Sequence, residues 1–238
     1  MSTVGFVLFP NLTQLDLTGP YEIFSRMPDT TVHLVAASST PVRSERGLTI
    51  APDLTFDHAA RFDILCVPGG PGVNAMMEDE RLLRFLRTQG DGARYVTSVC
   101  TGALLLGAAG LLRGYRATTH WLSLDLLPLF GAEPVDARVV VDRNRITGGG
   151  VTAGIDFGLA VAAELHGAAA AQDIQLMIEY NPAPPFQSGS PRTAPADVVT
   201  RVAVGRRKVQ DERRSIAERA AAKCSAGPSG LPSEVHHA

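Results

Sequence analysis

The 238-residue sequence has few cysteines, few aromatic residues and no long hydrophobic run. Its three cysteines, at positions 66, 100 and 224, form no CxxC pair, which argues against a zinc site and against a disulfide framework. The longest apolar stretch, residues 104–112, is far shorter than the ~18 residues that a membrane span needs. The N-terminus has no basic region ahead of its apolar residues, so it is a poor signal peptide. We therefore expect a cytoplasmic protein with no membrane association.

An excess of charge and the common nucleotide-binding motifs are also absent. The formal net charge is −2, which gives no electrostatic reason to expect nucleic-acid binding. The glycine run at 148–150 matches neither a GxGxxG fingerprint nor a Walker A loop. We expect no nucleic acid, no metal and no cofactor. Apolar residues nevertheless make up 45% of the chain, enough for a packed core.

The apolar residues in the first half of the chain fall into short runs that alternate with helix-like segments. The runs are continuous, as strands of a parallel sheet covered on both faces must be, and the alternation predicts an α/β doubly wound sheet. The predicted strands are 4–9, 32–37, 63–68 and 95–99. The predicted helices are 20–27, beginning at Pro20, then 79–89 and 101–112.

The second half of the chain is expected to begin with a hairpin at 137–149 that turns at 142–144. The segments predicted after it are helices at 152–166 and 168–180, a Pro-rich loop at 181–195 and a helix at 197–223. Eight basic and three acidic residues lie between 201 and 223. We expect one α/β domain over 1–195, a helix over 196–223 that packs on the core or on a dimer partner, and a flexible tail over 224–238.

The strongest chemical signal is the segment YVTSVCTGALL, Tyr95–Leu105. A buried strand enters a polar turn, and a helix of small residues follows at once, which is the layout of a nucleophile elbow at Cys100. The helix N-terminus is expected to lower the Cys100 pKa and to make the thiol easy to oxidise. The alternative is a buried, inert cysteine. That interpretation suits Cys66, which lies in mid-strand, whereas Cys224 is expected in the tail.

Two further features are expected to face Cys100 from neighbouring strand ends. GGPG at 69–72 permits close approach of backbone and substrate, and the N–H groups of Gly70 and Thr101 are expected to form an oxyanion-hole-like pair, with Gly69 beside them. A plain turn is the alternative. Asp16 follows the first strand and is a candidate proton shuttle, or else a helix cap ahead of Pro20.

Three more residues are possible pocket residues. His120 in ATTHW is the natural partner for a cysteine, but a thiolate at a helix end needs no base, so we interpret it as pocket-lining or structural. Gly150 and Thr152 lie in a glycine-rich segment ahead of a helix. This segment is expected to be a hinge or a second backbone contact with the pocket.

With these residues assembled, the chain resembles the ThiJ/PfpI superfamily over roughly residues 3–190. The matching features are GGPG after the third apolar run, SVCTGA at the elbow and an acidic residue after the first strand. The resemblance implies a flavodoxin-like three-layer αβα sandwich, related to class I glutamine amidotransferase domains. It also implies a reactive elbow cysteine and a homodimer.

Within the superfamily, FPNLTQLDLTGPYEIF, ATTHW and ITGGGVTAGIDF are similar to a branch that contains isonitrile hydratases and the sensor domains of some AraC-type regulators. The hydratases add water to an isonitrile to give an N-substituted formamide, without a cofactor. The resemblance implies that Cys100 is the nucleophile, that Asp16 is the catalytic carboxylate and that Thr101 matches the threonine after the nucleophile. An intermediate thioimidate on Cys100 is expected.

Three alternatives are less favoured. A sensor of the AraC type carries two helix-turn-helix units, which need more chain than the about forty residues after Pro195. A peptidase of this superfamily has a histidine directly after the nucleophile, where Thr101 stands. Glyoxalase- or deglycase-like members normally have glutamate in place of Asp16.

Overall fold

The computed structural model describes residues 1–225. The strands are β1 Ser2–Val7, β2 Thr30–Ala36, β3 Val42–Arg43, β4 Thr49–Ile50, β5 Leu54–Thr55, β6 Ile64–Val67, β7 Tyr95–Val99, β8 Arg116–Ala117, β9 Glu133–Pro134, β10 Val139–Asp142 and β11 Arg145–Gly148. The α-helices are α1 Gln14–Phe24, α2 Val73–Met76, α3 Glu80–Gly90, α4 Gly102–Ala108, α5 Ala153–Met177 and α6 Ala196–Ser225, and η1 Trp121–Phe130 is a 3₁₀ helix.

A seven-stranded sheet forms the centre of the molecule, in the order β10-β11-β7-β6-β1-β2-β5. Its pairings are parallel except for β10 with β11, which form the predicted hairpin. The four predicted strands are confirmed to within two residues at each end. The predicted mostly parallel, flavodoxin-like sheet is therefore confirmed, and the carboxyl ends of β1, β6 and β7 lie next to one another.

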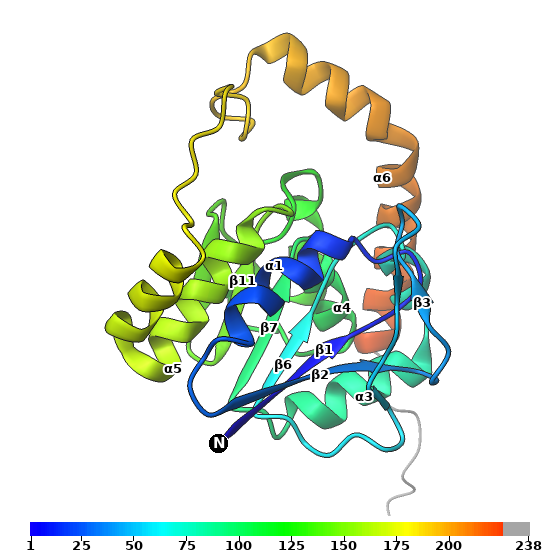
Figure 1. Ribbon diagram of the computed structural model, residues 1–238. Helices are drawn as coiled ribbons and strands as arrows, with labels where there is room; N and C mark the ends of the chain where they lie inside the picture. The colour runs from blue at the N-terminus through cyan, green and yellow to red at the C-terminus, as the bar shows by residue number, and fades with distance from the viewer. Residues whose placement is uncertain (226–238) are drawn as a thin grey trace, which may run out of the picture.

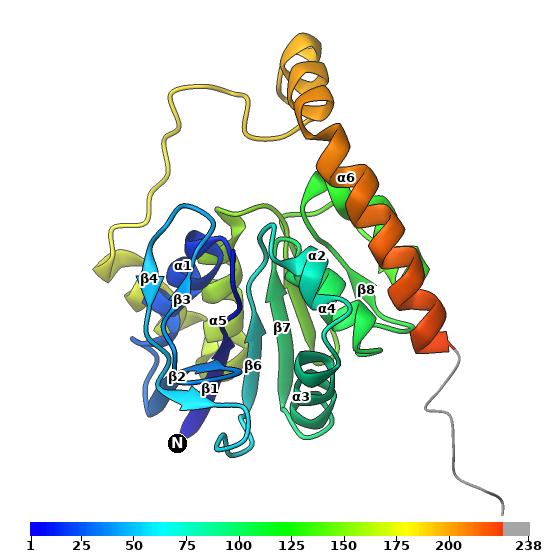
Figure 2. The ribbon, with the colours of Figure 1, turned by 90° about the vertical axis from the view of Figure 1, so that its right-hand side faces the viewer.

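Helices cover both faces of this sheet, as the two ribbon views show (Figures 1 and 2). On one face α1 packs along α5. On the other face α3 and α4 pack together, and η1 and α6 lie outside α4. The second half of α6 lies against η1 and α4, while its first half extends beyond the sheet edge at the end of a long loop (Figure 2).

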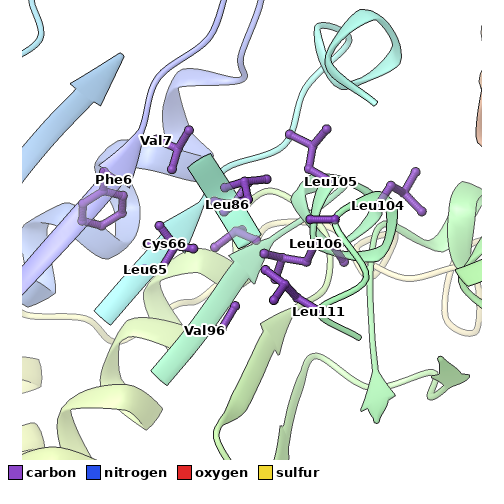
Figure 3. Close-up of a cluster of buried hydrophobic side chains, with 14 of the residues drawn as sticks. Phe6, Val7, Leu65, Cys66, Leu86, Val96, Leu104, Leu105, Leu106 and Leu111 are labelled. Carbon is purple, nitrogen blue, oxygen red and sulfur yellow. The ribbon is translucent and has the colours of Figure 1, made fainter. Parts of the chain in front are cut away.

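The core fills the space between the sheet and the helices on both of its faces. Phe6 of β1, Cys66 of β6 and Val96 of β7 have no exposed surface, and α4 contributes three consecutive buried leucines, Leu104–Leu106 (Figure 3). β6 is buried along its whole length, as expected for a strand with a covered neighbour on each side. This packing holds the strand ends rigidly above the core.

The prediction that a helix begins at Pro20 is wrong, because α1 begins six residues earlier, at Gln14. Proline inside a helix removes one backbone hydrogen bond. Here its ring is buried against α5, where a Cβ on Gly154 would lie 2.9 Å from the Pro20 Cδ. Close packing of the two helices offsets the lost bond. Asp16 consequently lies in the first turn of a helix, not ahead of one.

The predictions for the C-terminal helices have different outcomes. Two helices were predicted at 152–166 and 168–180, and the non-helical backbone of Gly167, with φ 85°, separates two helical parts of α5 at that point, as predicted. Cys224 was assigned to a tail, but α6 continues to Ser225 and the Cys224 side chain is half-buried. The rest of the predicted tail, residues 226–238, lies outside the described residues.

Candidate active site

Cys100 sits at the turn between β7 and α4, with a backbone φ of 55°. A non-glycine residue in this left-handed region is strained, and such strain is typical of functional turns. The turn is held from both sides, because the Cys100 N–H donates to the Gly148 carbonyl at 3.0 Å and the Thr119 hydroxyl donates to the Cys100 carbonyl at 2.7 Å. The predicted elbow geometry is present.

Gly102 lets the elbow lie against the end of β6. A Cβ on this residue would lie 2.2 Å from the Val67 carbonyl oxygen and 2.7 Å from that of Pro68. Neither backbone atom can yield without displacing the strand, so only glycine fits. This close approach brings the turn after β6 next to Cys100.

Asp16 reaches the same point from the first turn of α1. Its side chain is fully buried, and the Gly69 N–H donates to Oδ2 at 3.0 Å. Oδ1 is buried and makes no hydrogen bond with another group in residues 1–225. Burial raises the pKa of Asp16 to about 7, against the lowering effects of the Gly69 N–H and the Cys100 thiol, while nearby Glu45 adds to the rise. Asp16 is therefore able to hold or release a proton near neutral pH.

The turn after β6 brings Gly69 and Gly70 to Thr101, but not in the predicted arrangement. The Gly70 N–H donates to the Thr101 hydroxyl at 3.0 Å, so it is not free to bind an oxyanion. The Thr101 N–H instead faces the Cys100 sulfur and stabilises its charged form. The two N–H groups expected to form an oxyanion hole therefore have different partners. That of Gly70 binds the Thr101 hydroxyl, and that of Thr101 faces the Cys100 sulfur.

The prediction of a lowered Cys100 pKa is wrong. The side chain is only 5% exposed, and burial raises the pKa of this thiol well above its usual value, with the charge of Asp16 adding to the rise. The Thr101 N–H and the Arg213 guanidinium oppose the shift, but they do not outweigh desolvation. The thiol is therefore protonated at neutral pH. The prediction that Cys100 oxidises readily assumed an exposed thiolate of low pKa, and the structure has a buried thiol of raised pKa instead.

A small cavity of about 120 Å³ opens onto Cys100. Gly70, Thr101 and His120 line it, as the sequence predicted, together with Thr13 and Glu45. Its outer wall comes from α6, whose role sequence reasoning missed; the lining residues of this helix are Arg206, Val209, Gln210 and Arg213. They lie more than a hundred positions from Cys100, and the only available signal was the basic composition of the segment.

The three possible pocket residues have different positions. His120 caps η1, since its Nδ1 accepts from the Leu122 N–H at 3.3 Å, and burial lowers its pKa to about 4. It is therefore a neutral wall of the cavity. Gly150 lies beside the His120 ring, whereas Val151, not Thr152, lines the cavity. Thr152 is exposed and its carbonyl accepts from Arg138 at 3.0 Å, because the start of α5 turns it outward.

No group of three or more His, Cys, Asp or Glu side chains within residues 1–225 is arranged to hold a metal ion. In the same part of the chain, no helix has the length and apolar character to cross a membrane. Cys66 is fully buried, and its pKa is raised to about 12 by burial, so its interpretation as a core thiol is confirmed. The candidate reacting groups are therefore Cys100, which lines the cavity, and Asp16, which is buried behind it in hydrogen-bond contact with the thiol.

Comparisons with known proteins agree with this geometry. The chain is 56% identical over 220 residues to an isonitrile hydratase of Pseudomonas putida, covering 92% of this chain and 96% of that enzyme. It is 31% identical to the HTH-type transcriptional regulator GbdR of Pseudomonas aeruginosa, over 75% of this chain and 50% of the regulator. A ThiJ/PfpI family protein from Pseudomonas syringae is 45% identical, with a TM-score of 0.89 over 91% of this chain and 90% of that one. Residues 2–164 match the DJ-1/PfpI family, and the chain belongs to that family.

Proposed function

We propose that the protein is an isonitrile hydratase, which adds water to an isonitrile to give an N-substituted formamide. The observation on which the substrate class rests is the 56% identity to the Pseudomonas putida isonitrile hydratase across nearly the full length of both chains. The site supports it independently, because the Cys100 thiol lines a small cavity and is hydrogen-bonded to a buried carboxyl group of raised pKa, that of Asp16. Such a pair suits covalent addition with proton transfer.

The first half of the reaction forms a thioimidate on Cys100. The isonitrile carbon is electrophilic and also has a lone pair. Ionised Asp16 takes the thiol proton as the Cys100 sulfur bonds to that carbon, and the proton then passes from Asp16 to the carbon. The product is Cys100–S–CH=N–R, and no net proton has left the site. This sequence needs no resting thiolate, in keeping with the raised pKa of Cys100.

The second half releases the product. Asp16, ionised again, removes a proton from water as the water oxygen adds to the thioimidate carbon, and it passes this proton to the nitrogen. The carbon–sulfur bond then breaks while Asp16 takes the hydroxyl proton of the adduct and gives it to the departing sulfur, and the formamide leaves. A carboxyl group with a pKa of about 7 is suited to accept and donate in turn at neutral pH.

The decisive measurement is formamide formation from an aromatic isonitrile by the purified full-length protein. We expect turnover by the wild type and none by Cys100→Ala. Asp16→Asn keeps the shape of the side chain but cannot move protons, so we expect a loss of about 10²- to 10⁴-fold. Cys224→Ala, at a half-buried position on α6, is the matched cysteine control and should keep wild-type activity. Full activity of Cys100→Ala would exclude the mechanism.

A ligand-sensing role is the second candidate, favoured by the 31% identity to GbdR over 75% of the chain. The match covers half of that regulator. The same assay distinguishes the two functions. Tight binding of a small isonitrile by wild type, measured by calorimetry and unaccompanied by turnover, would favour the sensor. Turnover of glyoxal in place of isonitriles would indicate another cysteine-dependent activity of this family.

We also propose that the protein forms a homodimer. Large apolar side chains are exposed along the segment that runs from the end of α5 to the first turns of α6, namely Leu176, Met177, Phe186, Val202 and Val204, and exposed apolar surface of this kind marks interaction sites. Light scattering coupled to gel filtration should give twice the chain mass of 25.2 kDa. A monomeric mass at micromolar concentration would contradict the proposal.

A further inference from the structure

Arg213 is the buried arginine of α6, and no carboxylate in residues 1–225 forms an ion pair with it, although the charge of neighbouring Glu212 acts on it. Its side chain is 5% exposed. Nε donates to the Asn74 Oδ1 at 2.8 Å and Nη1 donates to the Ser123 hydroxyl at 3.1 Å, both neutral groups. By contrast, the exposed Arg201, Arg214 and Arg219 of the same helix each pair with a carboxylate. The structure gives Arg213 no ion pair within residues 1–225.

A buried guanidinium without a counter-charge is costly, so such groups normally face a negative charge. Arg213 lines the cavity together with Cys100, and its positive charge favours the thiolate. Asn74 of α2 and Ser123 of η1 fix its orientation, since they bind two of its nitrogens. The guanidinium is thus held in the wall of the cavity that Cys100 also lines, where its charge acts on the sulfur that becomes negative in the proposed reaction.

The other charged groups around the cavity do not take over this task. Asp16 is acidic and opposes a thiolate, Glu45 acts on Asp16, and His120 is neutral near pH 7 because its pKa is lowered to about 4. Arg206 also lines the cavity but is exposed to solvent, which screens its charge. Arg213 is therefore the buried positive charge of the site.

We propose that Arg213 is a positioning residue of the active site, whose fixed guanidinium balances the negative charge on the Cys100 sulfur as the thiol loses its proton. The inference rests on the proposed function for its role in turnover, but the charge balance itself is a property of the free site. Arg213 lies beyond the region that matches the family, residues 2–164, so α6 supplies a charge that the family-matched core does not contain.

The test measures the rate at which iodoacetamide alkylates Cys100 as a function of pH, in the Cys224→Ala background, with Arg213→Gln, Arg213→Lys and Arg214→Gln. We expect Arg213→Gln to raise the midpoint of the alkylation profile by about one pH unit or more, which is tenfold in thiolate at a given pH. With an isonitrile, kcat/KM should fall roughly 10- to 100-fold by the same reasoning. Arg213→Lys should restore the midpoint to near the wild-type value.

Arg214→Gln is the matched control, because it removes the same charge from the next position of α6 and breaks a contact between α6 and Asp125 of η1. It should leave the profile unchanged. A wild-type midpoint in Arg213→Gln overturns the proposal whatever happens to turnover. So does an equal shift in Arg214→Gln, or no recovery in Arg213→Lys. Because alkylation needs no isonitrile, a wild type that alkylates normally but turns over no isonitrile refutes the proposed function alone.

Discussion

Two buried cysteines belong to adjacent strands of the sheet, one within its strand and the other directly after the end of its strand. Cys66 is in the middle of β6, fully buried, and Cys100 follows the end of β7 and is 5% exposed. Burial raises the pKa of both thiols. Burial alone therefore does not distinguish the core thiol from the candidate nucleophile.

The difference lies in the backbone and in what it places beside the sulfur. Cys66 has the extended backbone of a strand, and its side chain packs among leucines and valines (Figure 3). Cys100 is in the left-handed region at φ 55°, where the chain turns and the sulfur leaves the plane of the sheet. A carboxyl group, a backbone N–H and a guanidinium converge on it there. A strand end permits such convergence, while a strand interior is enclosed by apolar neighbours.

The largest expected effect is the contrast in native-state reactivity between these two thiols. In the Cys224→Ala protein at pH 8, iodoacetamide should modify Cys100 through the cavity but reach Cys66 only after global unfolding. With ordinary domain stability, we expect Cys66 to react slower by at least roughly a thousandfold. Intact-mass analysis over time, with peptide mapping, should show one addition at Cys100 and a second only in denaturant.

Native labelling of Cys66 at a rate similar to that of Cys100 would break the comparison, because it would mean that β6 opens as readily as the elbow. Cys100→Ala is the appropriate control, since it should remove the fast addition and leave the slow one. Peroxide is a second probe of the same contrast. The raised pKa of Cys100 predicts oxidation slower than that of an exposed low-pKa thiol.

The sequence predicts those parts of the site whose conformation is determined by residues close to one another in the chain. The elbow, GGPG and the strand ends are recognisable because small residues and apolar runs fix their conformation within about ten residues. The position of Asp16 near Cys100 also follows, because parallel strands end at one edge. The start of α1 does not follow, since a proline inside a helix is tolerated only when a partner such as Gly154 packs against it.

The remaining features depend on contacts that are distant in sequence. Arg213 binds Asn74 and Ser123 across 139 and 90 residues, and no local pattern separates it from the neighbouring exposed arginines. The raised pKa of Cys100 has the same origin, because desolvation is caused by α1 and α6 as well as by the elbow itself. A helix end favours a thiolate in isolation, but here the surrounding burial is the larger effect.

A smaller effect is the pH dependence of stability caused by Asp16, the buried carboxyl group in contact with Cys100 after the end of β7. Its folded pKa of about 7 lies above the ordinary value of 3.8 for an aspartate, so between these two pH values the folded protein keeps a proton that the unfolded chain releases. The stability that this proton confers is complete below about pH 3.8 and is lost as the pH rises through 7.

Asp16→Asn removes this penalty while keeping an oxygen for the Gly69 N–H. We therefore expect the free energy of unfolding of Asp16→Asn minus that of wild type to increase, in the direction of a more stable variant, by on the order of 3 kcal/mol between pH 5 and pH 8. Urea denaturation of both proteins at several pH values measures this difference, and subtraction cancels the other titrating groups. Asp125→Asn, at an exposed carboxylate, should give a difference that is flat with pH.

A flat difference for Asp16→Asn as well would show that the carboxyl group is not desolvated in the folded site. A rising one would show that the protein accepts lower stability at neutral pH in order to keep a proton carrier beside Cys100, a cost that functional sites often impose.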